Sequence, residues 1–233
     1  MNILKTCTIR WLSCCLIFLP VPLLLLQFGC NNSNGLAPLI ITREDSLLKI
    51  ELLTRAYSSI TKAKQSIQTG DIITRTGNDF TSESLRSLNQ RDKTYSHCGI
   101  ASIEKDSLFI YHAIGGEWNP DEKLKREPFE TFAAPHSNNR FGIFRFNIPD
   151  TNIASLVQVA HRQFAKGLHF DMDFDLKTND RMYCAEFIYK SLLEASHQQL
   201  SFNKSRIGKF MFVGVDDIFL HPLCKKIGEV VFK

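Results

Sequence analysis

Two apolar runs separated by a short polar turn place the strongest constraint on how this chain can fold. Residues 97–103 and 108–114 are both typical of β-strands, and the polar segment 104–107 between them is typical of a hairpin turn. If the turn is centred on its two middle residues, the register of the hairpin is fixed. Because side chains alternate between the two faces of a sheet, that register places His97 and His112 on one face as diagonal neighbours. A slip of one residue would place them on opposite faces.

A cysteine much later in the chain can complete a site with these histidines. Residues 180–196 carry apolar side chains at helical spacing, and Cys184 lies on that stripe near the helix start. Asn179 or Asp180 is the expected N-cap. A thiolate there gains from the helix dipole and from free backbone N–H groups, which lower its pKa. Since the stripe packs against the sheet, we expect Cys184 to meet His97. The alternative is a buried structural cysteine.

These side chains have the chemistry of a thiol nucleophile with its base. His97 would accept the thiol proton and return it to the leaving group, while His112 would orient His97 through a hydrogen bond. Tyr183 would place its hydroxyl beside the oxyanion, or would serve only in packing. Two other interpretations stay open. Each histidine is an ordinary half-buried residue, or His97, His112 and Cys184 bind zinc. No closely spaced histidine pair accompanies them, so neither a metal nor a cofactor is expected.

The neighbouring residues are assigned structural roles. Cys98 follows His97 in the strand, so it faces the opposite side of the sheet and is expected in the core. Cys224 stays unassigned, and a disulfide between Cys98 and Cys224 is open. Glu186 lies on the side of its helix away from the apolar stripe, which favours a structural ion pair, with Arg75 as one candidate partner.

The N-terminal segment is expected to be a targeting signal. Within residues 1–29, a charged start precedes an almost uncharged apolar run, and Cys30 follows directly. This pattern resembles a bacterial lipoprotein signal in which Cys30 is lipidated. The alternative is an uncleaved membrane anchor. Residues 30–42 then form a tether and residues 43–233 a single domain. Both interpretations hold that domain at a membrane surface outside the cytoplasm, anchored through its N-terminus.

Charge and cysteine content exclude two classes of protein. The chain has 28 Lys and Arg against 24 Asp and Glu, a formal charge of +4, and it lacks a long basic run, so no nucleic-acid partner is expected. Of its seven cysteines only Cys98, Cys184 and Cys224 lie beyond Cys30. An odd number leaves at least one free thiol, so the domain is not a disulfide scaffold.

The remaining elements indicate an α+β fold with an antiparallel sheet. Two helices and further strands are expected around the hairpin, and the polar segment before it is expected to be a surface segment. The expected elements are a helix over 44–66, a strand from 72, the polar surface segment 78–93, a strand over 140–147, a helix from 149 to 167 and a final strand over 229–232.

Several short motifs together resemble a known family. The segments resemble those of the YiiX-like proteins, which belong to the NlpC-type superfamily of papain-like cysteine hydrolases with a circularly permuted order. The matching segments are Gly70-Asp71-Ile72, Ser96-His97-Cys98-Gly99-Ile100, Tyr111-His112-Ala113, Gly167 to Asp171 with Phe174, Tyr183-Cys184-Ala185-Glu186-Phe187 and Val215-Asp216-Asp217-Ile218. The resemblance spans roughly residues 44–233.

The resemblance implies both a fold and a set of roles. It implies a circularly permuted papain-like α+β fold in which an antiparallel sheet packs against helices. It also implies Cys184 as the nucleophile, His97 as the base and His112 as the third polar residue. Two positions depart from the family pattern. Ala185 replaces the usual serine, and His112 stands where many relatives carry glutamate.

The resemblance leaves the substrate open. It implies hydrolysis of an amide bond through an acyl-thioester on Cys184, in a cell-wall peptide, a peptidoglycan fragment or an N-acyl substrate. The same residues would serve an acyltransferase or a lipid thioesterase. A catalytically silent lipoprotein that binds lipid or peptide is the alternative outside enzymes.

Overall fold

The structure is a computed structural model that describes residues 42–115, 119 and 121–232. The expected signal peptide, the lipidation site at Cys30 and nearly all of the expected tether lie outside these residues. Residues 41–233 form one compact unit. Within the described part of the chain, no helix has the length and apolar character needed to cross a bilayer.

The fold is α+β, as the sequence predicts. Its main sheet has six strands in the order β4-β3-β2-β1-β5-β8, and each neighbouring pair is antiparallel. The helices are α1 (Arg43–Lys64), α2 (Phe80–Leu88), α3 (Phe129–Phe132), α4 (Asp150–Ala165), α5 (Cys184–Ala195) and α6 (Val215–Phe219). The sheet strands are β1 (Ile72–Gly77), β2 (His97–Glu104), β3 (Ser107–His112), β4 (Lys125–Pro128), β5 (Asn138–Phe146) and β8 (Cys224–Val231). A separate hairpin consists of β6 (Ser205–Ile207) and β7 (Phe210–Phe212).

The predicted register of the β2–β3 hairpin is confirmed. Ile103 pairs with Leu108, and the pairing continues back along both strands. The turn residues Lys105 and Asp106 have φ values of 47° and 66°, which is the left-handed geometry of a tight two-residue hairpin turn.

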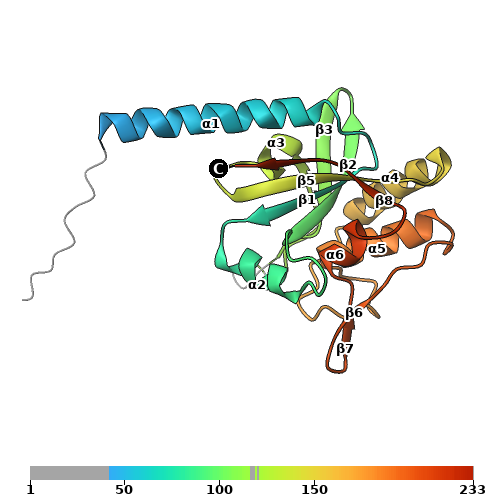
Figure 1. The fold of residues 1–233 in the computed structure, drawn as a ribbon. Coiled ribbons are helices and arrows are strands. Elements are labelled where there is room, and N and C mark those ends of the chain that lie inside the picture. The colour runs from blue at the N-terminus through green and yellow to red at the C-terminus, as the bar shows by residue number, and fades with distance from the viewer. Residues whose placement is uncertain (1–41, 116–118, 120, 233) are drawn as a thin grey trace, which may run out of the picture. The chain divides into compact units, whose positions relative to one another are not determined.

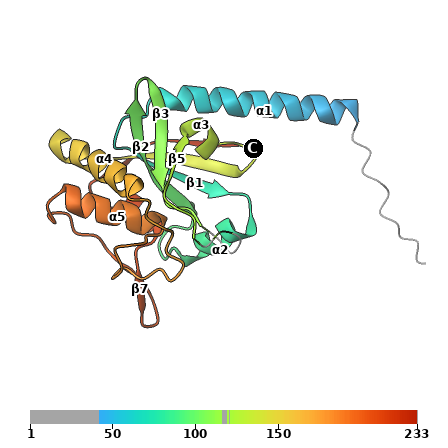
Figure 2. The ribbon, with the colours of Figure 1, turned by 180° about the vertical axis from the view of Figure 1, so that it is seen from behind.

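Helices cover both faces of this sheet (Figures 1 and 2). Helices α4 and α5 lie on one face, where Cys98, Ile100 and Cys184 belong to one apolar cluster. Helix α3 and the buried Ile60 of α1 lie on the other face, where Phe132 belongs to a second cluster. Strand β5 contributes alternate side chains to the two clusters, because successive side chains of a strand face opposite sides of the sheet.

The Gly-Asp-Ile segment fixes the entrance to β1. Gly70 has a φ of 89°, and a Cβ at this position would lie 2.5 Å from the Ile153 side chain. Asp71 is buried and accepts two hydrogen bonds from Arg145, at 2.7 and 2.8 Å. It also accepts one from the Gln68 backbone N–H at 2.8 Å. The contacts of this motif therefore hold the turn after α1 against strand β5.

The polar segment 78–93 contains helix α2, which has no buried residue, in agreement with the predicted surface segment. Its N-cap Asp79 accepts a hydrogen bond from the Ser82 N–H at 2.9 Å. The expected start of the helix that carries Cys184 is wrong. Helix α5 begins at Cys184 itself rather than near Asp180, and Tyr183 is its N-cap. The Glu186 carboxylate accepts the Tyr183 backbone N–H at 3.2 Å, which satisfies a donor at the helix start and fixes that boundary. Strand β4 and the β6–β7 hairpin were not predicted.

Candidate active site

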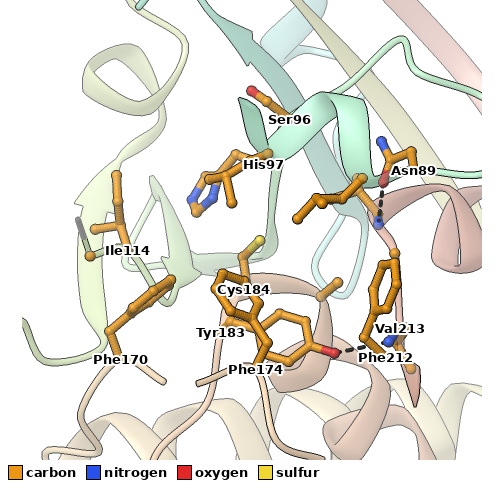
Figure 3. Close-up of a pocket in the computed structure, with 16 residues that line it drawn as sticks. Asn89, Ser96, His97, Ile114, Phe170, Phe174, Tyr183, Cys184, Phe212 and Val213 are labelled. Carbon is orange, nitrogen blue, oxygen red and sulfur yellow. Dashed lines mark hydrogen bonds between the residues drawn. The ribbon is translucent and has the colours of Figure 1, made fainter. Parts of the chain in front are cut away.

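Cys184 is the first residue of α5 and lines a narrow apolar slot together with His97 (Figure 3). The Cys98 thiol lowers the pKa of Cys184, and the backbone N–H groups of Cys98, Ala185 and Cys184 add to this effect. Burial of the sulfur acts in the opposite direction but does not prevail. The pKa of Cys184 therefore lies below the ordinary thiol value, which favours the reactive thiolate.

Cys98 is a neighbour of Cys184 that the sequence analysis assigned only to the core. It is fully buried on the face that α5 covers, and burial raises its pKa well above the ordinary value, so it keeps its proton. A protonated thiol can donate to the Cys184 sulfur. Cys98, Cys184 and Cys224 are all free, so the disulfide between Cys98 and Cys224 is not present.

Replacing Cys98 with alanine is expected to raise the pKa of Cys184, because the anion loses a donor while staying buried. Cys98→Ser, which keeps a hydroxyl donor, is the matched control and should shift that pKa less. The measurement is the rate of iodoacetamide alkylation at Cys184 as a function of pH, followed by peptide mass spectrometry. Identical pH profiles for the wild type and Cys98→Ala would show that Cys98 does not act on the sulfur.

The expected contact between the two histidines is present. His97 Nε2 lies 2.8 Å from His112 Nδ1, and both side chains are buried. His112 Nε2 lies 3.2 Å from a carboxylate oxygen of Glu127, although the two atoms do not meet the geometry of a hydrogen bond. Glu127 lies on the edge strand β4 and was missed, because the short sequence Lys-Arg-Glu-Pro carries no alternation that would place it.

This chain of contacts assigns the protons on both rings. Glu127 accepts only, so the His112 Nε2 carries the proton that faces it. His112 Nδ1 is then the acceptor, and His97 Nε2 is the donor of their hydrogen bond. His97 Nδ1 is left with its lone pair free to act as a base, and no described residue hydrogen bonds to it.

Both imidazoles are held neutral. Burial, with the nearby Arg75 charge and then His112, lowers the pKa of His97 well below its ordinary value. Burial also lowers the pKa of His112, although its contact with Glu127 acts in the opposite direction. The contact with His112 lowers the pKa of Glu127, so the carboxylate stays ionised. His97 is therefore in its base form at neutral pH.

Cys184 and His97 approach the pocket from opposite faces of the sheet. His97 packs near Phe132, with ring centroids 5.7 Å apart, whereas Cys184 belongs to the apolar cluster of Cys98. They meet because His97 is the first residue of β2, where the strand ends at the pocket. The predicted meeting of the two residues in one pocket is seen, but no hydrogen bond joins the sulfur to the imidazole. Helix α5 covers the Cys98 face of the sheet rather than the face of His97.

Tyr183 and Glu186 make structural contacts. The Tyr183 hydroxyl accepts the Val213 backbone N–H at 2.9 Å, which turns it toward the segment before α6 (Figure 3). We therefore assign Tyr183 to positioning that segment rather than to the oxyanion. Glu186 is fully buried and lies 2.8 Å from the Lys190 ammonium, so Lys190 rather than Arg75 is its ion-pair partner.

Two hollows of different character meet at His97. The slot beside Cys184 has a volume of about 50 Å³, and its walls are mostly apolar. On the other side of His97 lies a wider, polar cavity of about 380 Å³. Ser96, Ile114 and Gly115 also border both hollows. The apolar walls of the slot include Leu85, Leu88, Phe170, Phe174, Phe212 and Val213. A bound molecule could therefore place an apolar part near Cys184 and a polar part beyond His97.

The zinc interpretation does not fit the arrangement. His97 Nε2 and His112 Nδ1 face each other in a hydrogen bond, so they do not converge on a point where a cation could sit. Among residues 42–115, 119 and 121–232, no group of three or more His, Cys, Asp and Glu side chains is placed to hold a metal ion.

A solved structure shares this architecture. The structure of the metalloprotein YiiX from Escherichia coli O157:H7 superposes with a TM-score of 0.58 at 18% sequence identity, covering 71% of this chain and 99% of that one. The chain has the YiiX fold. That fold is consistent with the expected permuted papain-like arrangement of sheet and helices. No model of a protein family and no curated protein matches the sequence.

Proposed function

We propose that this protein is a thiol-dependent hydrolase of amide bonds, with Cys184 as the nucleophile, His97 as the base and His112 as the residue that orients His97. The observation that best supports this proposal is a chain of contacts from Glu127 through His112 to His97. The chain ends beside a pocket that Cys184 also lines. A thiol of lowered pKa and a neutral imidazole in one pocket are the two groups that acyl transfer through a thioester requires.

The proposed reaction begins when the Cys184 sulfur turns from Cys98 toward the pocket. His97 Nδ1 takes the thiol proton as the sulfur attacks the amide carbonyl, and a C–S bond forms. The C–N bond then breaks, and His97 delivers the proton to the leaving nitrogen. Water, deprotonated by His97, attacks the thioester and releases the acid and the thiol. Backbone N–H groups at the start of α5 are the donors available to the oxyanion.

The shapes of the hollows favour an amide substrate with a small apolar acyl part. A slot of about 50 Å³ admits a small side chain, whereas the polar cavity beyond His97 has room for a larger polar group. A cell-wall peptide or an N-acyl amino acid has this form. From the N-terminal sequence alone we also propose an extracytoplasmic lipoprotein, held at the membrane through Cys30.

One observation favours the alternative of an acyltransferase or lipid thioesterase. A further apolar hollow of about 240 Å³ adjoins the slot and shares Phe170 and Phe174 with it. Together the two could hold an acyl chain that the slot alone could not. An unreactive Cys184 that nevertheless retains ligands would instead indicate a binding lipoprotein.

The test is the reactivity of the thiol. At pH 7, Cys184 is expected to react with iodoacetamide faster than free cysteine, because its pKa is lowered. Cys224, whose pKa burial raises to about 12, is the internal control in the same digest and should react slowly. Purified protein and Cys184→Ala are then compared in a hydrolysis screen of muropeptides, N-acyl amides and ester lipids. Alkylation of Cys184 no faster than that of free cysteine would contradict the proposal.

A further inference from the structure

Arg75 is a cation built into the same sheet face as the proposed base. It lies directly opposite His97 in the pairing of β1 with β2, so the two side chains are neighbours on one face. Its guanidinium lies 4.6 Å from the centre of the Phe132 ring, and Nη1 donates to the Phe132 carbonyl at 2.9 Å. Arg75 also lines the polar cavity that His97 borders. Its place is therefore set by the fold.

The charge of Arg75 has no direct counter-ion among the described residues. The carboxylates of Glu127 and Asp79 and the sulfur of Cys184 act on it at longer range, and both carboxylates are engaged elsewhere. Glu127 contacts His112. Asp79 accepts the Ser82 N–H at 2.9 Å and the Ser82 hydroxyl at 2.7 Å. Burial lowers the pKa of Arg75, which shows that the site disfavours its unpaired charge.

The Arg75 guanidinium has more N–H donors than the Phe132 carbonyl uses. It carries five N–H groups in a planar fork, and one of them is used by the Phe132 carbonyl. A carboxylate fits the remaining donors well, because two parallel N–H···O bonds match its geometry. The other cation among the described residues that line the cavity, Lys125, already lies 3.4 Å from Glu122. Arg75 is therefore the group most suited to an anion entering this cavity.

We propose that Arg75 binds the carboxylate of the leaving amino acid, so that the substrate is an acylated α-amino acid with a free carboxylate. This inference rests on the proposed function. His97 must return a proton to the leaving nitrogen, which therefore lies close to its ring. In an α-amino acid the carboxylate is one carbon away from that nitrogen, and Arg75 is the side chain directly beside His97. The acyl part then occupies the apolar slot at Cys184.

Two kinds of molecule supply an acylated α-amino acid with a free carboxylate: a free N-acyl amino acid and the C-terminal residue of a peptide.

The test measures ligand binding by calorimetry on full-length Cys184→Ala, which cannot turn the ligands over. The ligands are N-butyrylglycine, its carboxamide N-butyrylglycinamide, and N-acetylalanylglycine with its carboxamide. Each carboxylate is expected to bind about 10- to 100-fold more tightly than its carboxamide. Preference for the butyryl or the peptide ligand identifies the source.

The decisive comparison is the double variant Cys184→Ala/Arg75→Gln. Its carboxylate preference is expected to fall to within about threefold of equal binding, because the neutral amide side chain cannot form the charged pair. Cys184→Ala/Arg75→Lys should keep a reduced preference, and Cys184→Ala/Lys125→Gln should keep it in full. Thermal melts establish that each variant is folded.

Equal or absent binding of carboxylate and carboxamide by Cys184→Ala would overturn the inference, as would a preference that survives Arg75→Gln. Neither result bears on the proposed function, because that is tested by alkylation of Cys184 in the wild-type protein. Rapid alkylation of Cys184 without a preference for the carboxylate ligands would indicate a thiol hydrolase of another specificity. Slow alkylation of Cys184 with a preference for the carboxylate ligands would indicate a binding protein.

Discussion

His97→Ala is expected to lower kcat/KM for amide hydrolysis by about 10²- to 10⁴-fold, the usual contribution of a general base. The loss follows from the proposed geometry. His97 Nδ1 is the free nitrogen of the pair, and no other imidazole lines the slot beside Cys184 among the described residues. The measurement is kcat/KM on whichever amide the hydrolysis screen identifies, together with the alkylation rate of Cys184 at pH 7. Both should fall.

His161→Ala is the matched control for this prediction. Its side chain is 42% exposed on α4 and contacts Glu104 at 3.4 Å, away from the slot. It should leave both rates near those of the wild type. His112→Ala should retain more activity than His97→Ala, since His112 acts only through the orientation and tautomer of His97. Equal rates for His97→Ala and the wild type would remove His97 from the mechanism.

The contact between the two histidines could be predicted because few arrangements of the hairpin are possible. A four-residue turn sets the register, and the alternation of side chains then decides which residues share a face. His97 and His112 follow from these two facts alone. The α+β class and the segregation of β5 side chains between two cores follow from the same alternation.

The parts of the site that were missed depend on more than the alternation of side chains along a strand. This alternation places Cys98 and His97 on opposite faces of the sheet, but it does not say which face a helix much later in the chain will cover. That helix covers the Cys98 face, so Cys98 rather than the imidazole lies beside the sulfur of Cys184. Glu127 was missed for a different reason. It lies on a four-residue edge strand whose sequence is entirely polar apart from its proline.

The start of α5 shows how tertiary contacts decide a boundary. Asn179 and Asp180 are good capping residues, and the sequence favoured a helix start there. The chain around Arg181 instead forms a bridge with His169. The helix therefore starts at Cys184, one residue after its N-cap. That shift places the thiol closer to the free N–H groups than the sequence predicted, which strengthens the case for a reactive cysteine.

Asp217→Ala is expected to destabilise the fold by about 3–5 kcal/mol, the usual result of removing one partner of a buried charge network. Asp217 is 2% exposed. One of its oxygens accepts hydrogen bonds from the Ser205 N–H, the Ser205 hydroxyl and the Gly214 N–H, at 3.1, 2.8 and 2.8 Å. The other lies 3.0 Å from the Arg91 guanidinium. Alanine would leave three donors and a charge without their acceptor.

The change should be measured as the free energy of unfolding in urea, and the loss corresponds to a fall in Tm of roughly 6–20 °C for a domain of this size. Asp180→Ala is the control, because its side chain is 76% exposed and lies 3.8 Å from Arg181. It should change stability by less than about 1 kcal/mol.

Asp217 joins the segment before β2 to the base of the β6–β7 hairpin, and Val213 and Gly214 beside it line the slot. A loss below about 1 kcal/mol in Asp217→Ala would mean that this network does not hold the slot wall in place.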